Sequence, residues 1–462
     1  MNVPLCVSYL VIASLVYGIV NIYAQKKELL RIFFKKGFAF SGIVFALIAL
    51  EIGGSMMLGT CEEGYSSGLY GLLYVIGISI GFLLLGFGFA AKMKAMNVEN
   101  TIDLFEIKYR SPLIRTSASI LSIITTWGLL LGQIVAAKSL VHALGIQNNI
   151  VFIALSLFVI IYAVLGGLKA AGITYSAQLA YTIVVFGGIF GFCLLKEPPS
   201  FFTDVFLNQS LFSDTSISFA SIFGSLIMPA LYYLTDQEFA RPLFAISSKT
   251  EAAISAVIAS IFMLIFSLVP IYFGIKAKAM NLVIADDMSP LIPVLQLLTN
   301  DLMVAFAVCG MAAALIAMID YYLWSVSLSI THEMHLAYPN LKHNERLDKS
   351  MVIIVGLIAT FASYCTTSNA IQVLLYSYEL YDSCLIVPLL MSYFQSDLKK
   401  GAAIGAFLSG LSGFIIFRIM PIPIPGHIAS LALSFIGFYL GGMIETGLRR
   451  LPVFKRSGTC SV

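Results

Sequence analysis

Four acidic residues lie inside stretches of this sequence that are otherwise apolar: Glu51, Asp320, Glu379 and Asp382. An acid in such a setting is expected to bind a cation or carry a proton, because a bare carboxylate at membrane depth is costly. Glu51 is the most informative of the four, since it lies in the apolar stretch 38–58 and is followed by Gly53 and Gly54. Glycines weaken a helix at the same depth. An acid beside a helix break is typical of a substrate or ion site at the membrane midplane.

The composition indicates a polytopic membrane protein. The chain has 462 residues, of which 59% are hydrophobic and 11% are charged, whereas soluble proteins carry about 25% charged residues. Its seven cysteines are scattered and show no metal-ligand spacing, so neither a disulfide framework nor a metal site is predicted. The metalloprotease pattern HExxH and the Walker loop are absent, and we expect no enzyme, no organic cofactor and no nucleic-acid partner.

Apolar stretches long enough to span a bilayer recur along the whole chain. We predict an all-α fold with about 13 transmembrane helices, at 4–23, 38–58, 69–92, 114–142, 149–168, 172–195, 217–235, 251–275, 302–331, 350–368, 370–394, 401–418 and 426–447. This division places 22 of the 27 lysine and arginine residues on one side. The positive-inside rule then predicts a cell (inner) membrane protein with its N-terminus outside and its C-terminus in the cytoplasm.

Two of these segments contain features that interrupt helices. The second, 38–58, has the glycine pair after Glu51, and the seventh, 217–235, contains Pro229. They are five segments apart, and a five-segment unit that repeats in order must invert, because five is odd. Paired breaks in two inverted halves indicate a central binding site. From spacing alone, the alternative remains that glycine and proline are simply common in membrane helices.

Several motifs resemble those of one transporter family. The run 166–178 reads Gly-Gly-Leu-Lys-Ala-Ala-Gly-Ile-Thr-Tyr-Ser-Ala-Gln, which is similar to the signature of the sodium:solute symporter family of proline, sialic acid and sugar symporters. Further stretches agree in order, at 57–59, 236–241, 330–333 and 399–402. The resemblance implies a leucine-transporter-type fold with a 5+5 inverted-repeat core and broken helices. It also implies solute uptake driven by a sodium gradient.

The resemblance divides the chain into four parts. Residues 1–37 would form a peripheral N-terminal helix and an inner loop. Residues 38–195 and 217–394 would form the two inverted repeats. Residues 401–462 would form peripheral C-terminal helices and a basic tail.

The family's sodium site would lie between the first broken helix and the ninth segment. Carried over by alignment, its positions are Ala49, Ile52, Ala314, Ala317 and Met318. Two of these positions need hydroxyls, and they hold Ala317 and Met318, neither of which offers the hard oxygen that sodium prefers. The family's aspartate in the Gly-Gly-Leu motif is replaced by Tyr175. The usual sodium site is therefore expected to be degraded.

The candidate substrate-binding or coupling residues are Glu51, Ser55, Met56, Asp320, Gln372, Glu379 and Asp382. By resemblance, Glu51 matches a coupling aspartate of proline symporters, and Gln372 aligns with a sugar-binding glutamine when about two residues are inserted. Asp320 lies one helical turn after Ala317, and Glu379 and Asp382 share a helix face. None of the four acids has a clear basic partner among the spans.

Two interpretations of these acids stay open. They could carry protons, because a desolvated carboxylate favours its neutral form, or they could neutralise a cationic solute or rebuild a shifted sodium site. A third possibility is that some face water at helix ends.

We therefore predict a cation-coupled symporter for a small polar organic solute, such as an amino acid or a sugar, that works by alternating access. The coupling ion would be Na+ or H+, and the partners would be the solute and the lipid bilayer, with a monomer plausible. The alternative is a transporter-like sensor or a scaffold that does not transport.

Overall fold

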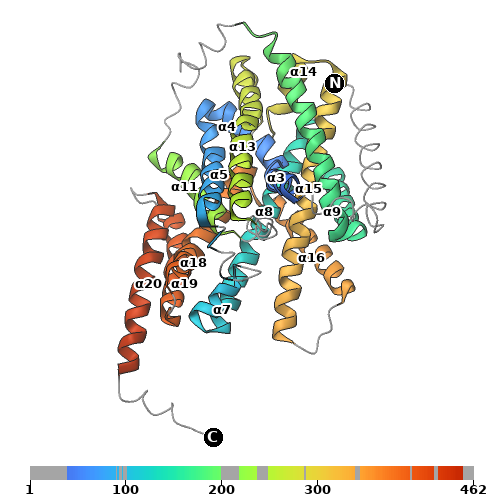
Figure 1. The fold of residues 1–462 in the computed structure, drawn as a ribbon. Coiled ribbons are helices and arrows are strands. Elements are labelled where there is room, and N and C mark those ends of the chain that lie inside the picture. Colours follow the sequence, from blue (N-terminus) through green and yellow to red (C-terminus); the bar gives the residue numbers. More distant parts are fainter. Residues whose placement is uncertain are drawn as a thin grey trace. The chain divides into compact units, whose positions relative to one another are not determined.

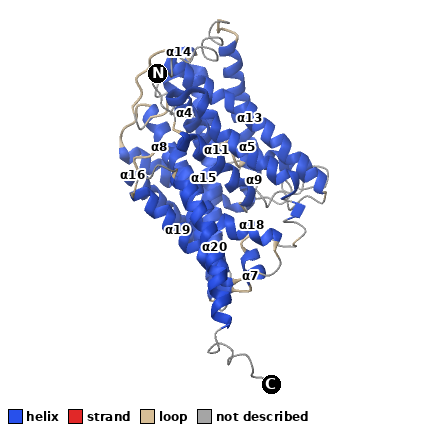
Figure 2. Cartoon of the chain, turned by 90° about the vertical axis from the view of Figure 1, so that its left-hand side faces the viewer, coloured by secondary structure: helices blue, strands red, loops and turns tan. Residues whose placement is uncertain are grey.

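The structure is a computed structural model that describes most of the chain. The described residues are 39–89, 91–92, 96, 101–198, 218–236, 248–285, 288–338, 344–395, 398–420 and 425–450. Every regular element among them is a helix (Figure 2), as a bilayer requires of chains that must satisfy their backbone hydrogen bonds internally. The predicted segment 4–23 and the basic tail lie outside the described residues.

The chain divides into two compact units, each interleaved along the sequence. The first unit comprises Met1–Ile80, Thr126–Ile217 and Ile254–Leu374, and the second comprises Gly81–Thr125, Ser218–Ala253 and Leu375–Val462. The predicted inverted repeats, 38–195 and 217–394, stay a prediction.

The first unit is built around one long helix, α15. Its elements are α3 (Ala39–Ala49), η1 (Ser55–Gly59), α4 (Thr60–Ser67), η2 (Gly68–Gly71), most of α5 (Leu72–Leu84), the second half of α8 (Pro112–Ala143), α9 (Asn149–Leu194), most of α13 (Lys249–Ala279), α14 (Leu291–Leu298), α15 (Asp301–Ala337), α16 (Glu345–Cys365) and the start of α17 (Ala370–Tyr381) (Figure 1). Helix α15 packs against α9 and α16. The indole of Trp324 on α15 donates to the carbonyl of Ala163 on α9 at 3.1 Å. Almost the whole middle of α15 is buried, which explains its nearly unbroken apolar sequence.

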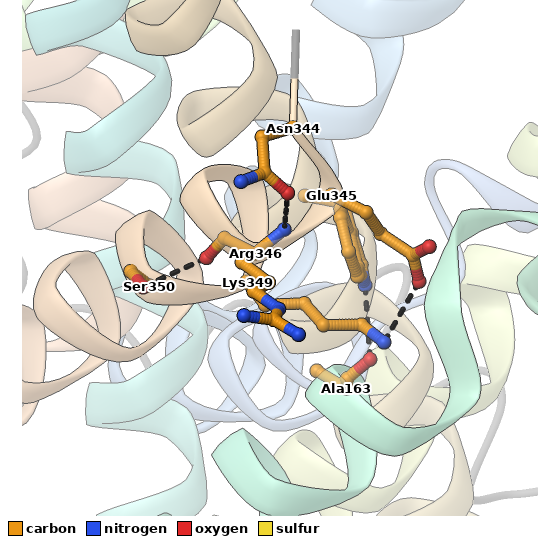
Figure 3. Close-up of polar contacts among 7 residues, drawn as sticks. Ala163, Asn344, Glu345, Arg346, Lys349 and Ser350 are labelled. Carbon is orange, nitrogen blue, oxygen red and sulfur yellow. Dashed lines mark hydrogen bonds and ion pairs between the residues drawn. The ribbon is translucent and has the colours of Figure 1, made fainter.

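The start of α16 shows why that helix begins where it does (Figure 3). Asn344 has an extended backbone, and its side chain accepts a hydrogen bond from the backbone N–H of Arg346 at 3.0 Å. Asparagine is a favoured N-cap, because it satisfies one of the orphan donors at a helix start. Glu345 and Lys349 then form an ion pair one turn apart, at 2.8 Å.

The second unit contains the C-terminal helices. Its elements are η3 (Leu85–Phe89), α7 (Asp103–Tyr109), the first half of α8, α11 (Phe219–Thr235), the end of α17, η5 (Asp382–Ile386), α18 (Val387–Phe394), α19 (Lys400–Ile419) and α20 (Gly426–Arg450). Helices α19 and α20 approach closely through glycines. A Cβ atom on Gly405 or Gly441 would collide with backbone atoms of the facing helix, so larger residues are excluded there.

The all-helical membrane fold is confirmed, whereas the predicted number of about 13 spans stays a prediction. Among the described residues, nine helices are long and apolar enough to cross a membrane, and two shorter apolar helices accompany them. The predicted segments 149–168 and 172–195 form one helical run, α9, of 46 residues. A straight helix of that length would be about 69 Å long, about twice the apolar thickness of a bilayer. It contains the candidate span Asn149–Gly166 and the shorter apolar stretch Gln178–Leu194.

The predicted interruption after Glu51 is confirmed, whereas the predicted interruption at Pro229 is wrong, because the helix continues through that residue. Helix α3 ends at Ala49, two residues before Glu51. Helix α11 runs through Pro229 and ends at Thr235. Proline removes one backbone donor, but membrane helices tolerate that loss where neighbouring groups satisfy the freed carbonyl.

Candidate functional site

The break in the first unit is centred on Glu51. The N–H of Ile52 still donates to the Ile48 carbonyl at 3.0 Å, but the N–H of Gly53 turns back to the Glu51 carbonyl at 2.7 Å. A new helix then starts, with the N–H of Met57 donating to the Gly53 carbonyl at 3.2 Å. The side chain of Glu51 is buried, with 5% of its surface exposed. The acid therefore lies where the backbone leaves the helical hydrogen-bonding pattern, as the sequence predicted.

The glycine pair is required by the close approach of α15. A Cβ atom on Gly53 would lie 2.6 Å from Cγ of Met318, and one on Gly54 would collide with the side chain of Leu315. Real Cβ atoms are not found so close to their neighbours, so any larger residue at either position would force the side chain of Met318 or Leu315 to move. The broken segment is thereby held against the α15 face that carries Ala314, Ala317 and Met318.

A glutamine that was not predicted fixes the start of the second half of the break. Gln133, on α8, donates through Nε2 to the hydroxyl of Ser55 at 2.6 Å and accepts from the Ser55 N–H at 3.2 Å. It is itself buried. The two bonds satisfy a helix-start donor that has no intrahelical partner. The available signal was an amide in the middle of the apolar stretch 114–142, but its partner lies 78 residues away.

The residues of the expected sodium site all lie in the first unit. Ile52, Ala314, Ala317 and Met318 are buried, and Ala49 is half-buried. The packing of Met318 against Gly53 agrees with the expected meeting of the break and α15. The side chain at that position is a thioether, which is a poor ligand for a hard cation. Whether an ion binds there stays a prediction.

Three further predicted site residues also lie in the first unit. Met56 and Asp320 are buried, with 1% and 2% of their surfaces exposed. Gln372 is exposed in the first turn of α17, where its N–H donates to the side chain of Asn369 at 2.8 Å. The adjacent Ile371 packs against Gly59. Thus Met56 and Asp320 are enclosed by protein, whereas Gln372 is not.

The remaining two acids lie in the second unit and differ from each other. Glu379 has a basic partner, contrary to expectation, because Arg418 on α19 donates to its carboxylate at 3.1 Å. Arg418 also stacks over the ring of Tyr376, with 3.8 Å from the guanidinium carbon to the ring centroid. Arg418 is the last residue of the predicted segment 401–418, and the sequence could not show that its helix brings it to Glu379. Asp382 has no exposed surface and begins the π-helical turn η5.

The pattern Gly-x-Ser-x-Gly, which marks the nucleophile of some hydrolases, occurs at 64–68 and 77–81. That chemistry requires a sharp strand-to-helix turn that exposes the serine. Here Ser66 lies on α4 and donates to the carbonyl of Glu63 at 3.2 Å. Ser79 lies on α5, where it exchanges hydrogen bonds with Ser260 on α13. Ser66 is thus an exposed helix residue, and Ser79 joins two packed helices.

Comparison with known proteins supports a transporter. The model of the sodium:solute symporter family matches residues 34–196. The chain is similar to a Na+-coupled sialic acid symporter in its substrate-bound, outward-open state, with 15% identity and a TM-score of 0.70 over 96% of this chain and 97% of that one. It is also similar to inward-facing Mhp1, with 12% identity and a TM-score of 0.54 over 90% and 92% of the two chains. It is similar as well to MhsT in complex with L-phenylalanine, with 14% identity and a TM-score of 0.52 over 89% of this chain and 98% of that one.

At these identities the solved structures establish a shared fold. The predicted resemblance to the sodium:solute symporter family and the leucine-transporter-type fold are confirmed. The matched family and the neighbours are transporters and not enzymes. The protein is accordingly a multi-pass membrane protein.

Proposed function

We propose that the protein is a secondary active transporter that carries a small polar organic solute together with a cation by alternating access. The observation that carries this proposal is the buried break at Glu51, which α15 covers closely and Gln133 fixes. Broken helices with a buried acid supply both a charge and unpaired backbone groups, which are what an ion or solute needs at the membrane midplane.

Glu51 and Asp320 are proposed as the acids of the first unit that take part in coupling. The family resemblance favours Na+ as the coupling ion. The side chains of Ala317 and Met318 favour an ion that needs fewer oxygen ligands, because neither has the oxygen that Na+ prefers. Because Glu51 and Asp320 are both buried acids, they favour an amine or a zwitterion as the solute over an anion.

We place the N-terminus outside and the C-terminus in the cytoplasm of a cell (inner) membrane, on the distribution of basic residues. We also propose that 38–195 and 217–394 are the inverted repeats whose relative motion exposes the site to each side in turn.

Reconstitution tests the proposal. The purified protein is placed in proteoliposomes, and the uptake of labelled amino acids, polyamines and sugars is measured under a Na+ gradient and, separately, under a proton gradient. We expect at least one solute to accumulate above its external concentration under one gradient. A chain that binds solutes in a thermal-shift assay but never accumulates them would instead be a sensor or scaffold.

A further inference from the structure

The π-helical turn at Asp382 is a second irregularity of a membrane helix, and it lies wholly within the second unit. It joins α17 to α18, and α11, α19 and α20 pack against it. Single π-turns inside α-helices often mark functional sites. Pro388 follows within two turns, and because proline has no N–H, the carbonyl one turn before it loses its usual donor. The main chain at this turn is therefore less fully hydrogen-bonded than a regular helix.

The side chain of Asp382 is fully enclosed and unpaired. None of its surface is exposed, and neither carboxylate oxygen has a hydrogen-bond partner in the part of the chain that the structure describes. A buried ionised carboxylate without a partner costs several kcal/mol, so such a group neutralises instead. Each unsatisfied buried polar group in a native protein needs an explanation of this kind.

Hydrogen-bond donors next to Asp382 in the chain, and the arginine of a helix that packs against the turn, are used elsewhere. The hydroxyl of Ser383 donates to Ser430 on α20 at 2.9 Å. The hydroxyl of Tyr381 donates to the carbonyl of Thr235, at the end of α11, at 3.4 Å. Arg418 on α19 forms an ion pair with Glu379 and stacks on the rings of Tyr376 and Phe414. The guanidinium of Arg418 is thus already paired with another acid.

The ionisable groups of the packed elements are mostly neutral or acidic. Among the described side chains they are Tyr232, Tyr233 and the following Asp236 from α11, Tyr376, Tyr378, Glu379 and Tyr381 from α17, Cys384 from the turn itself, Tyr393 from α18, Lys400 and Arg418 from the two ends of α19, and His427, Tyr439 and Glu445 from α20. The tyrosines pack as a cluster, with 4.4 Å between the ring centroids of Tyr232 and Tyr378. Asp236 is buried as well, and it directly follows Thr235, whose carbonyl accepts the hydrogen bond from Tyr381, the residue before Asp382. Two acids that are buried close together disfavour each other's ionisation.

We propose that Asp382 is a proton-binding residue, and that its carboxylate gains and loses one proton during the transport cycle. A proton suits this site better than Na+, because one carboxylate is enough to bind a proton, whereas Na+ would need several oxygen ligands arranged around it. The proton is taken from water on one side and returned to water on the other when the packing of α11, η5 and α19 changes. The role in transport rests on the function proposed above, whereas the bound proton does not.

Infrared spectroscopy tests the bound proton without any transport assay. A protonated carboxyl group has a carbonyl stretch that an ionised carboxylate lacks. At neutral pH, the wild-type protein should show a protonated-carboxyl band that loses the intensity of one group in Asp382→Asn, whose amide resembles the neutral acid in shape. Asp382→Ser should show the same loss if the asparagine variant does not fold.

The exposed Asp301 supplies the matched control, and Asp301→Asn should keep the band. Equal bands in the wild type and both Asp382 variants would overturn the proposal, and a band that disappears on addition of Na+ would assign the site to sodium instead.

Transport then tests the coupling. In proteoliposomes, Asp382→Asn should lose at least about tenfold of its proton-driven accumulation, while exchange of labelled for unlabelled solute continues. Accumulation at the wild-type level would overturn the coupling role. If the wild type transports nothing, the proposed function fails, but the infrared bands still decide whether Asp382 holds a proton.

Discussion

The break at Glu51 in the first unit and the π-turn at Asp382 in the second both place a buried acid at an irregular point of a membrane helix, yet they are held in different ways. At the break, neighbouring helices supply partners, since Gln133 bonds to Ser55 and α15 packs over the glycines. At the π-turn, the carboxylate of Asp382 has no hydrogen-bond partner among the described residues. The backbone groups freed by a helix break are held by side chains of neighbouring helices. A single buried carboxyl group needs no such hydrogen-bond partner if, as proposed, it holds a proton.

The strongest test of the first region is Glu51→Gln. Truncating one partner of a buried charged contact costs about 2–5 kcal/mol, so we expect transport or solute binding to weaken about 30-fold or more. The measurements are initial uptake rates in proteoliposomes and solute affinity by calorimetry. Glu345→Gln is the control, because Glu345 is a largely exposed member of a surface ion pair. Wild-type transport by Glu51→Gln would remove Glu51 from the site.

The close approach of α15 is tested by Gly54→Ala. The added Cβ atom collides with the side chain of Leu315, and overpacking of this kind costs about 1–3 kcal/mol. Thermal unfolding of the purified protein in detergent should show a lower melting temperature. Gly188→Ala on α9 is the matched control, because nothing lies within 4 Å of its Cβ position. That variant should be neutral or slightly stabilising. Equal melting temperatures for the two alanine variants would mean that α15 does not pack on the break as described.

The pair of hydrogen bonds between Gln133 and Ser55 is tested by Gln133→Leu. Removing the amide leaves the N–H of Ser55 without its partner, at a cost of about 1–3 kcal/mol. Because Gln133 and Ser55 share two hydrogen bonds, combining Gln133→Leu with Ser55→Ala should cost less than the sum of the single changes. Unfolding in a denaturant series measures all three variants. Strict additivity would show that the two side chains act independently.

The sequence predicted the parts of this site that depend on neighbours in the chain. An acid followed by two glycines is a local signal, and the break lies where that signal placed it. The hydrogen bonds between Gln133 and Ser55 join segments that are far apart in the sequence, so the sequence showed only an amide in an apolar stretch. Pro229 shows the opposite error, because a local helix-breaking residue was tolerated inside α11.

The two acids of α17 and η5 show a similar limit. Their spacing on one helix was visible in the sequence, and both were given the same role. The structure separates them, because Arg418 arrives from another helix and pairs with Glu379, while Asp382 begins a π-turn. Neither the distant partner nor the change of helical pitch leaves a local pattern that composition or periodicity could reveal.

The smallest expected effect comes from Glu379→Gln, which sharpens the contrast within the second unit. The ion pair with Arg418 is partly open, with 35% of the arginine side chain and 15% of the glutamate side chain exposed, so its loss should cost at most about 1 kcal/mol. The amide can still accept from Arg418, and the guanidinium keeps its stacking on Tyr376. Arg418→Gln should cost more in thermal unfolding, because it leaves the half-buried carboxylate without its partner. If Glu379→Gln instead reduces uptake as strongly as Glu51→Gln does, Glu379 binds the solute or the ion, and the ion pair describes only one state of the cycle.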